Sequence, residues 1–197
     1  MNAKKTVAVF DFDGTITTKD TLLEFIKYSC GTISFYIGFL LYSPLLVLMK
    51  LHLYPNWKSK QKIFSWFFKG MSYSKFKQLG EDFKKEIENN IRQSIVNKVR
   101  EHVAEGTLVY VVSASIDEWV RPFCKTLGVK DVLCTEIEVD KNGIITGRFL
   151  NNNCYGQEKV NRLLQVEPER DAYFLYAYGD SRGDKEMLGF ADKGTLT

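Results

Sequence analysis

Four apolar residues, Val7 to Phe10, run directly into two carboxylates, Asp11 and Asp13, which Gly14 and Thr15 follow. An apolar run bounded by turn residues predicts a strand buried on both faces, as in a parallel sheet. Side chains alternate along a strand, so both carboxylates can share a face. Ligand sites of open α/β sheets lie beyond the carboxyl ends of the strands. Two such acids repel each other unless a cation intervenes, so the pair predicts a Mg²⁺ site or, alternatively, acids that cap the next turn.

Two further buried strands are expected to end in polar residues. Residues 107–112 form one apolar run and residues 173–178 another. The polar or small residues that follow these runs, or that open the helix before the second, are Ser113, Ala114, Lys159, Asp180 and Asp184. Taken singly, Ser113 could cap a helix and Lys159 could be a solvated lysine. Parallel strands nevertheless bring such residues to one edge of the sheet, which favours a shared site.

The segments between these strands predict helices and one hairpin. Asp20 is well placed as a helix N-cap. Residues 57–104 alternate lysines with apolar residues at helical spacing, which is typical of amphipathic helices. Residues 132–149 predict a hairpin that turns at Asn142 and Gly143. We therefore expect an α/β fold in which residues 1–16 and 105–197 form a Rossmann-like parallel-sheet core and residues 17–104 an inserted α-helical cap.

Composition excludes several classes of protein. The chain has 197 residues, a formal net charge of +3 and no dense basic patch, so we expect no nucleic-acid partner. Its four cysteines lack CxxC spacing, which argues against a zinc site and favours reduced thiols in a cytoplasmic protein. Oligomeric state is not determined by these features.

An uncharged stretch runs from Tyr28 to Met49 and is long enough to span a bilayer as a helix. Gly31, Gly38 and Pro44 interrupt it, and it contains several Tyr and Ser residues. We therefore expect a kinked helical hairpin that either buries itself or rests on a membrane surface. The second alternative predicts peripheral membrane contact through residues 28–54.

The order of the polar motifs resembles the haloacid dehalogenase superfamily. That family bears Asp-x-Asp-x-Thr, a strand-end Ser or Thr, a Lys and Gly-Asp-x-x-x-Asp, which match residues 11–15, Ser113, Lys159 and residues 179–184. The position of the insert is similar to subfamily IB, the branch of phosphoserine phosphatases. Its long uncharged segment looks like that of the bacterial phosphatidylglycerophosphate phosphatases.

The resemblance implies a Mg²⁺-dependent phosphatase that hydrolyses a phosphate monoester through an aspartyl-phosphate. Asp11 would be the nucleophile, and Asp13 would protonate the leaving oxygen and later deprotonate water. The metal would bind Asp11, the backbone carbonyl of Asp13, and Asp180. Asp184 would orient Lys159 or a metal-bound water. The residues expected to contact the phosphate or the rest of the substrate are Gly14, Thr15, Asp20, Ser113, Ala114 and Lys159.

The substrate stays open between a small-molecule ester and a lipid phosphate. Phosphoserine-directed relatives use a cap arginine for the substrate carboxylate, but this chain has no arginine before Arg92. They also carry Ser-Gly-Gly where residues 113–115 read Ser-Ala-Ser, and an Asn where Gly183 stands. Alternative functions are a lipid phosphatase acting on phosphatidylglycerophosphate-type substrates, a phosphotransferase or mutase, and, more remotely, a non-catalytic membrane-associated binding module.

Overall fold

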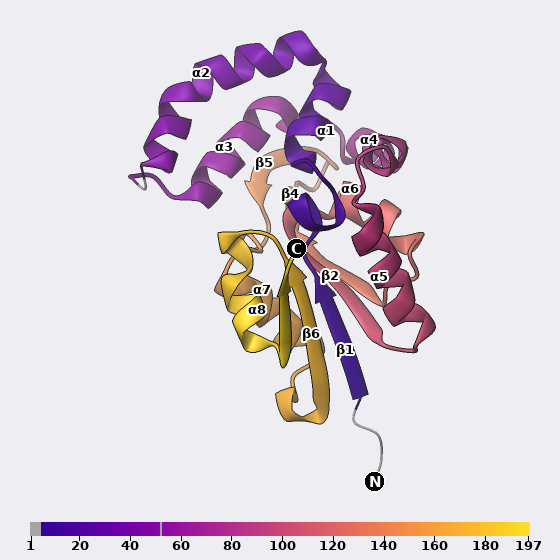
Figure 1. Cartoon of the computed structure of the whole chain (residues 1–197). Coiled ribbons are helices and arrows are strands. Elements are labelled where there is room, and N and C mark those ends of the chain that lie inside the picture. Colours follow the sequence, from indigo (N-terminus) through magenta and orange to yellow (C-terminus); the bar gives the residue numbers. More distant parts are fainter. Residues whose placement is uncertain (1–4, 52) are drawn as a thin grey trace.

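A five-stranded parallel sheet forms the centre of the computed structural model, which describes residues 5–51 and 53–197 (Figure 1). The strand order is β3-β2-β1-β6-β7, and every neighbouring pair is parallel. The strands are β1 (Lys5–Phe10), β2 (Leu108–Ile116), β3 (Asp131–Thr135), β6 (Tyr173–Gly179) and β7 (Lys193–Leu196). This arrangement confirms the expected α/β class with a Rossmann-like sheet.

The central strand β1 is apolar because both of its faces are covered. Ala8 and Phe10 belong to one hydrophobic cluster, whereas Val7 and Val9 belong to a second. All four side chains are fully buried. The period of two along a strand therefore directs alternate residues into cores on opposite sides of the sheet.

Helices occupy the connections between the strands. Between β1 and β2 lie α1 (Thr21–Cys30), α2 (Thr32–Lys50), α3 (Asn56–Phe68), α4 (Tyr73–Glu88) and α5 (Gln93–Ala104). The remaining α-helices are α6 (Asp117–Lys125), α7 (Gln157–Val166) and α8 (Lys185–Phe190). Short turns η1 (Phe12–Ile16), η2 (Arg170–Ala172) and η3 (Arg182–Asp184) complete the backbone, together with a hairpin of β4 (Ile137–Val139) and β5 (Ile145–Phe149).

Helices α1 to α4, here called the helical insert, lie beyond one end of the sheet (Figure 1). Helix α5 instead packs on the sheet layer, where its His102 Nε2 lies 2.9 Å from the Tyr178 hydroxyl of β6. We therefore assign α5 to the core. This differs from the boundary at residue 104 expected from the sequence, because the amphipathic pattern is the same whether a helix packs on a sheet or on other helices.

Residues 132–149 also differ in part from the sequence expectation. The apolar run before the turn divides at Glu136 into β3, which joins the central sheet, and β4, which pairs antiparallel with β5. The expected hairpin is present, but one strand of it is short. Pairing partners are non-local, so a single apolar run does not reveal where it changes sheets.

The chain leaves the core for the insert and returns to the core at the same place. Thr17 and Ile91 form an isolated antiparallel bridge, and the Thr18 amide donates to the Asn90 carbonyl at 2.7 Å. The Arg92 amide donates to the Ile16 carbonyl at 2.8 Å. The two connections are thus joined by backbone hydrogen bonds.

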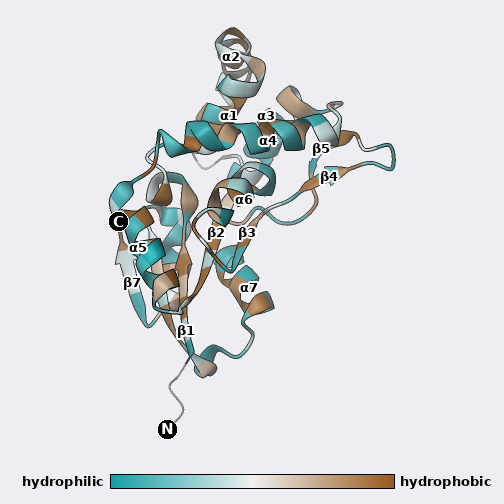
Figure 2. Cartoon of the chain, turned by 90° about the vertical axis from the view of Figure 1, so that its right-hand side faces the viewer, coloured by the Kyte–Doolittle hydropathy of each residue, from teal (hydrophilic) through white to brown (hydrophobic). Residues whose placement is uncertain are grey.

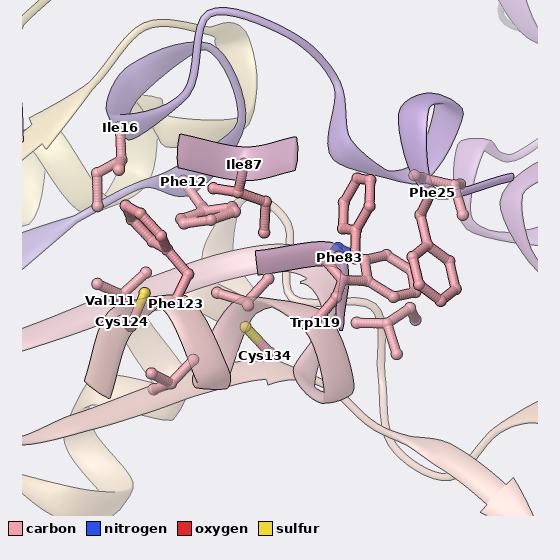
Figure 3. Packing of buried hydrophobic residues seen from close by; sticks show 14 of the residues in the cluster. Phe12, Ile16, Phe25, Phe83, Ile87, Val111, Trp119, Phe123, Cys124 and Cys134 are labelled. Atoms are coloured by element: carbon pink, nitrogen blue, oxygen red, sulfur yellow. The ribbon is translucent and has the colours of Figure 1, made fainter. Parts of the chain in front are cut away.

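Aromatic side chains fill the junction between the insert and the core. Phe25 of α1 stacks on Trp119 of α6 with ring centroids 4.5 Å apart, and Phe83 of α4 contacts the same phenylalanine edge-on (Figure 3). Helices α4 and α6 approach closely at Gly80, where a Cβ atom would lie 2.2 Å from the Glu118 carbonyl oxygen. Glycine is therefore required for this helix contact.

Helix α2 is a single continuous helix, which corrects the expected hairpin. The chain breaks at Gly31, whose φ is +83°, and then runs through Pro44 without interruption to Lys50. It forms the outermost layer of the insert (Figure 2). Within the part of the chain that the structure describes, α2 alone has the length and apolar composition to cross a membrane, and only 11% of its apolar window is buried.

The alternative in which this stretch buries itself is therefore wrong. One face of α2 does pack inward, through Phe35, Phe39 and Leu46. The opposite face exposes large apolar side chains, namely Ile33, Tyr36, Ile37, Leu40, Leu41, Val47 and Leu48. Helices α1 and α3 contact α2 within the same insert.

We predict that Glu118→Gln stabilises the protein at high pH. Burial raises the pKa of Glu118 to about 7 from 4.5, and its Oε2 has no hydrogen-bond partner among the described residues. Between pH 4.5 and about 7 the Glu118 carboxyl is therefore protonated in the folded state but ionised in the unfolded state. The free energy of unfolding falls as pH rises through this range. The variant should gain on the order of 1 kcal/mol at pH 8 but nothing at pH 4.5, measured by urea unfolding.

Glu81→Gln is the control, since Glu81 is exposed on α4. It should change stability at neither pH. A Glu118→Gln variant that loses stability at pH 8 would show that the charged carboxylate is well accommodated.

Candidate active site

The turn η1 carries the first two carboxylates away from β1. Gly14 has φ of +82°, and a Cβ atom there would lie 2.3 Å from Asp180 Oδ2. Only glycine allows this close approach of the turn to the end of β6. Phe12 turns in the opposite direction and packs in the core against Phe123, which anchors the turn (Figure 3).

Lys159 joins two carboxylates at the base of the site. Its Nζ donates to Asp11 Oδ1 and to Asp184 Oδ1, both at 2.5 Å, and all three side chains are buried. Burial raises the pKa of Asp11 to about 7, although the lysine charge opposes this shift. Burial alone would lower the pKa of Lys159, but Asp11 and Asp184 outweigh it, so that pKa lies above its usual value.

Asp184 holds the loop after β6 with its other oxygen. Asp184 Oδ2 accepts hydrogen bonds from the Asp180 amide at 3.2 Å, the Ser181 amide at 3.0 Å and the Ser181 hydroxyl at 2.9 Å. The loop that carries Asp180 is therefore tied to the same carboxylate that binds Lys159. Asp184 thus positions two of the predicted site residues.

Three carboxylates could hold a metal ion. Single oxygens of Asp11, Asp180 and Asp184 lie within 4.8 Å of one another. The oxygens of Asp184 are already engaged, which leaves Asp11 and Asp180 as the available ligands. Thr15 lies between them, and its hydroxyl is 3.4 Å from Asp11 Oδ2 and 3.2 Å from Asp180 Oδ1. Hard oxygen ligands of this kind fit Mg²⁺.

The side chain of Asp13 is held by donors from the insert and from β2. Its Oδ1 accepts from the Thr21 amide at 2.8 Å and the Thr21 hydroxyl at 2.6 Å, and its Oδ2 accepts from Ser115 Oγ. The indole of Trp119 donates to Thr21 Oγ1 at 3.0 Å. Both carboxylate oxygens are thus engaged away from Asp180, which leaves the backbone carbonyl for the metal role expected of Asp13.

Two of these contacts were not predicted. Ser115 was not among the predicted site residues, yet its hydroxyl bonds Asp13, and α6 begins only at Asp117. Lys60 of α3 was grouped with solvated lysines, yet its Nζ donates to the Ala114 carbonyl at 2.7 Å. Nothing in the local sequence distinguishes Lys60 from its neighbours, since the contact joins residues 54 positions apart.

The site opens into a cavity of about 410 Å³ between the insert and the core. Asp11, Asp13, Ser113, Ala114 and Lys159 line it from the core side. The insert contributes an apolar wall, made of Leu22, Leu23, Phe39, Leu46, Met49 and Ile63.

Of the remaining residues predicted to contact the substrate, Asp20 lines the cavity but Gly14 and Thr15 do not. Asp20 is at the wall of this cavity, and it also caps α1, as expected, by accepting from the Leu23 amide at 3.2 Å. Gly14 and Thr15 are not among the residues that line the cavity. Gly14 instead packs against Asp180, and Thr15 hydrogen-bonds Asp11 and Asp180, so neither residue forms an exposed phosphate-binding surface.

The fold, the three motifs that follow its strands and Lys159 of α7 define a member of a known enzyme family. Residues 8–189 match the family model of the haloacid dehalogenase-like hydrolases, and the chain belongs to this family. It is 32% identical over 196 residues to protein CicA of Caulobacter vibrioides, a match that covers 98% of this chain and 86% of CicA.

Solved structures show the same fold. A protein of unknown function from Bordetella pertussis has a TM-score of 0.81 at 20% identity, covering 95% of this chain and 87% of that one. A substrate-bound phosphoserine phosphatase has a TM-score of 0.65 at 20% identity, covering 96% and 84% respectively. The expected similarity to the phosphoserine-phosphatase branch is confirmed at the level of fold.

We predict that Lys159→Met lowers the free energy of unfolding by about 3 kcal/mol, because it leaves Asp11 and Asp184 buried without their partner. Lys98→Met is the matched control, since Lys98 binds Glu101 and the two side chains are 45% and 56% exposed. Loss of that exposed pair should lower the free energy of unfolding far less. Urea unfolding measures the free energy of unfolding of both variants. Equal losses would contradict the claim that the buried ion pairs of Lys159 contribute more to stability than an exposed pair.

Proposed function

We propose that this protein is a Mg²⁺-dependent phosphatase that hydrolyses a phosphate monoester through an aspartyl-phosphate at Asp11. The observation that carries the proposal is the placement of Asp11. One of its oxygens binds Lys159 at 2.5 Å, and the other lies beside Thr15 and the Asp180 loop. Neighbouring structures include a phospho-aspartyl intermediate analogue of phosphoserine phosphatase, which supports the same chemistry here.

In the first step, Asp11 would attack phosphorus while the bond from phosphorus to the leaving oxygen breaks. Asp13 would donate a proton to that oxygen, and then take a proton from the water that cleaves the acyl phosphate. Lys159 and Ser113 would bind phosphoryl oxygens and offset their charge. Mg²⁺ held by Asp11, the Asp13 carbonyl and Asp180 would offset the repulsion between carboxylate and phosphate.

Thr21 and Ser115 give Asp13 a defined orientation for this role. Because Thr21 begins α1, the acid–base group is hydrogen-bonded to the insert as well as to β2. The insert would therefore place Asp13 while it covers the cavity as a cap.

Two rival functions share the same site. A phosphotransferase or mutase would form the same intermediate but pass the phosphoryl group to a substrate hydroxyl. A non-catalytic binding module would need none of the contacts among Asp11, Lys159 and Asp184. The buried ion pairs among these residues favour an active enzyme.

We expect Asp11→Asn to reduce turnover of an aryl phosphate by at least ~10³-fold, which is about 4 kcal/mol of transition-state stabilisation. The amide is a poor nucleophile, although its shape is unchanged. Initial rates in the presence of Mg²⁺ measure the loss of turnover. The same assay with a metal chelator serves as the blank and should show no activity. Asp171→Asn, an exposed aspartate, is the control and should keep full activity. Activity of Asp11→Asn within tenfold of wild type would exclude the covalent mechanism.

The apolar surface of the insert favours a lipid phosphate as a second candidate substrate. Phe39, Leu46 and Met49 of α2 line the catalytic cavity, while the opposite face of the same helix is exposed. Each methylene of an acyl chain buried there would contribute about 0.8 kcal/mol. A small polar ester would gain nothing from such a wall.

We further propose that the protein is cytoplasmic and that this helix docks it on a membrane. Tyr36 lies on the outer face of α2, and its side chain is 65% exposed. Exposed lysines follow the apolar stretch: Lys50 ends α2, and Lys58, Lys62 and Lys69 lie on or directly after α3. Aromatic rings and lysines at the edge of an apolar face are typical of interfacial helices that bind anionic lipids.

A double variant, Ile37→Ser with Leu40→Ser, tests the membrane surface. Both side chains are more than half exposed, so the fold should not depend on them. Binding to vesicles of phosphatidylcholine and phosphatidylglycerol should fall at least about tenfold, since two apolar side chains that become buried in lipid contribute several kcal/mol to binding. Hydrolysis of a small aryl phosphate should persist. Unchanged vesicle binding, or the absence of vesicle binding in the wild type, would refute the membrane role.

A further inference from the structure

A second and larger hollow adjoins the catalytic cavity. Its volume is about 940 Å³, and it lies between the start of α3, the segment from β5 to α7, and α7 itself. Asn56, Asn153 and Tyr155 line both hollows, so the two share a wall. Tyr155 also packs over Gly183, just after Asp180. We call this hollow the amide groove.

Side-chain amides are the most numerous group in the lining of the groove, which also contains the apolar Phe149 and Leu150. The amides come from α3, from the consecutive asparagines after β5, and from α7, and comprise Asn56, Gln61, Asn151, Asn152, Asn153 and Gln165. An amide both donates and accepts hydrogen bonds, as a hydroxyl group does. Such a wall is therefore complementary to a ligand that carries several hydroxyl groups.

One of these amides has an unused donor. Asn151 Oδ1 accepts from the Glu136 amide at 3.0 Å, which fixes the side chain, whereas Asn151 Nδ2 is buried with no partner among the described residues. A buried donor without an acceptor is unfavourable by roughly 1–3 kcal/mol. Among the described residues, Asn151 is thus an amide in the groove lining that the chain itself leaves partly unsatisfied.

The charges of the groove are already paired. Glu158 and Arg162 are its charged residues, and they bind each other at 2.8 Å along one face of α7. The lining therefore favours a neutral group over an ammonium or a carboxylate. Trp57 and Tyr155 are nearly half exposed and offer ring faces on which the apolar face of a sugar or cyclic polyol can stack.

We infer that the amide groove binds a neutral polyhydroxylated group, a sugar or polyol, which is the leaving group of the phosphate ester cleaved at Asp11. This inference rests on the proposed phosphatase function and names its substrate class. The phosphate would lie at Lys159, and the hydroxylated part would extend past Tyr155 toward Trp57. The apolar wall from α2 lines only the catalytic cavity, so it does not enter this groove.

Paired tryptophan variants test the inference. Trp57 and Trp66 lie on the same helix with similar exposure, but Trp57 lines the groove and Trp66 does not. Trp57→Ala should lower kcat/KM for hexose and inositol phosphates about fivefold or more, mainly through KM, as expected for loss of a stacking contact. It should leave an aryl phosphate within about twofold, and Trp66→Ala should change neither.

A binding measurement separates this inference from the proposed catalysis. Saturation-transfer NMR with unphosphorylated hexoses and inositol should detect contact with the wild-type protein, and Trp57→Ala should weaken it. Binding without hydrolysis of any phosphate ester would refute the phosphatase proposal alone. Hydrolysis of aryl phosphate with no sugar or polyol bound, or an equal effect of both tryptophan variants, would overturn the groove's role while the phosphatase stands.

Discussion

The buried ammonium of Lys159 is the interaction on which the rest of the site depends. It binds Asp11 from β1 and Asp184 from the turn after β6, which are residues that lie far apart in sequence. Without this cation the two carboxylates would face each other in a medium of low dielectric constant. Three carboxylates nevertheless gather around one ammonium, so the cluster keeps an excess of negative charge. That excess suits a divalent rather than a monovalent ion. Burial, together with the charge of Asp184, raises the pKa of Asp11.

The insert contributes to chemistry as well as to selection of the substrate. Thr21, its first helical residue, donates twice to Asp13, and Lys60 binds the carbonyl of Ala114 at the end of β2. Any movement of the insert therefore changes the surroundings of the proposed acid–base group. Substrate preference would arise from two unlike surfaces, an apolar wall from α2 and an amide wall beside α3. Each surface would accommodate a different part of the proposed ester or a different class of ester.

Much of this organisation could be predicted from the sequence, because its signals are local. Uncharged runs at 7–10 and 173–178 identify buried strands, and polar residues directly after them must lie at one edge of a parallel sheet. Contacts between distant residues could not be predicted in this way. Ser115 and Lys60 bond partners that are unrelated by any periodic pattern. The assignment of α5 to the sheet, and the division of residues 131–139 between two sheets, depend on tertiary packing.

Helix α2 shows a different limit. Its apolar composition was evident, but composition is the same for a helix that is buried, spans a bilayer or lies on a surface. The structure shows which side chains of α2 face inward. Only the row containing Phe35, Phe39 and Leu46 is packed, and the remaining faces are open.

The two connections of the insert meet at the bridge between Thr17 and Ile91, and this pairing gives the fold modularity. A segment whose ends are neighbours can change in length or composition without shifting the register of β1 against β2 or β6. Evolution could thus exchange the helices above the sheet as a cassette while the strand ends retain their chemistry. One side chain marks the boundary of that cassette. The guanidinium of Arg92 donates to the Gly14 carbonyl at 2.9 Å, so the exit of the insert is fastened to the turn between Asp11 and Thr15.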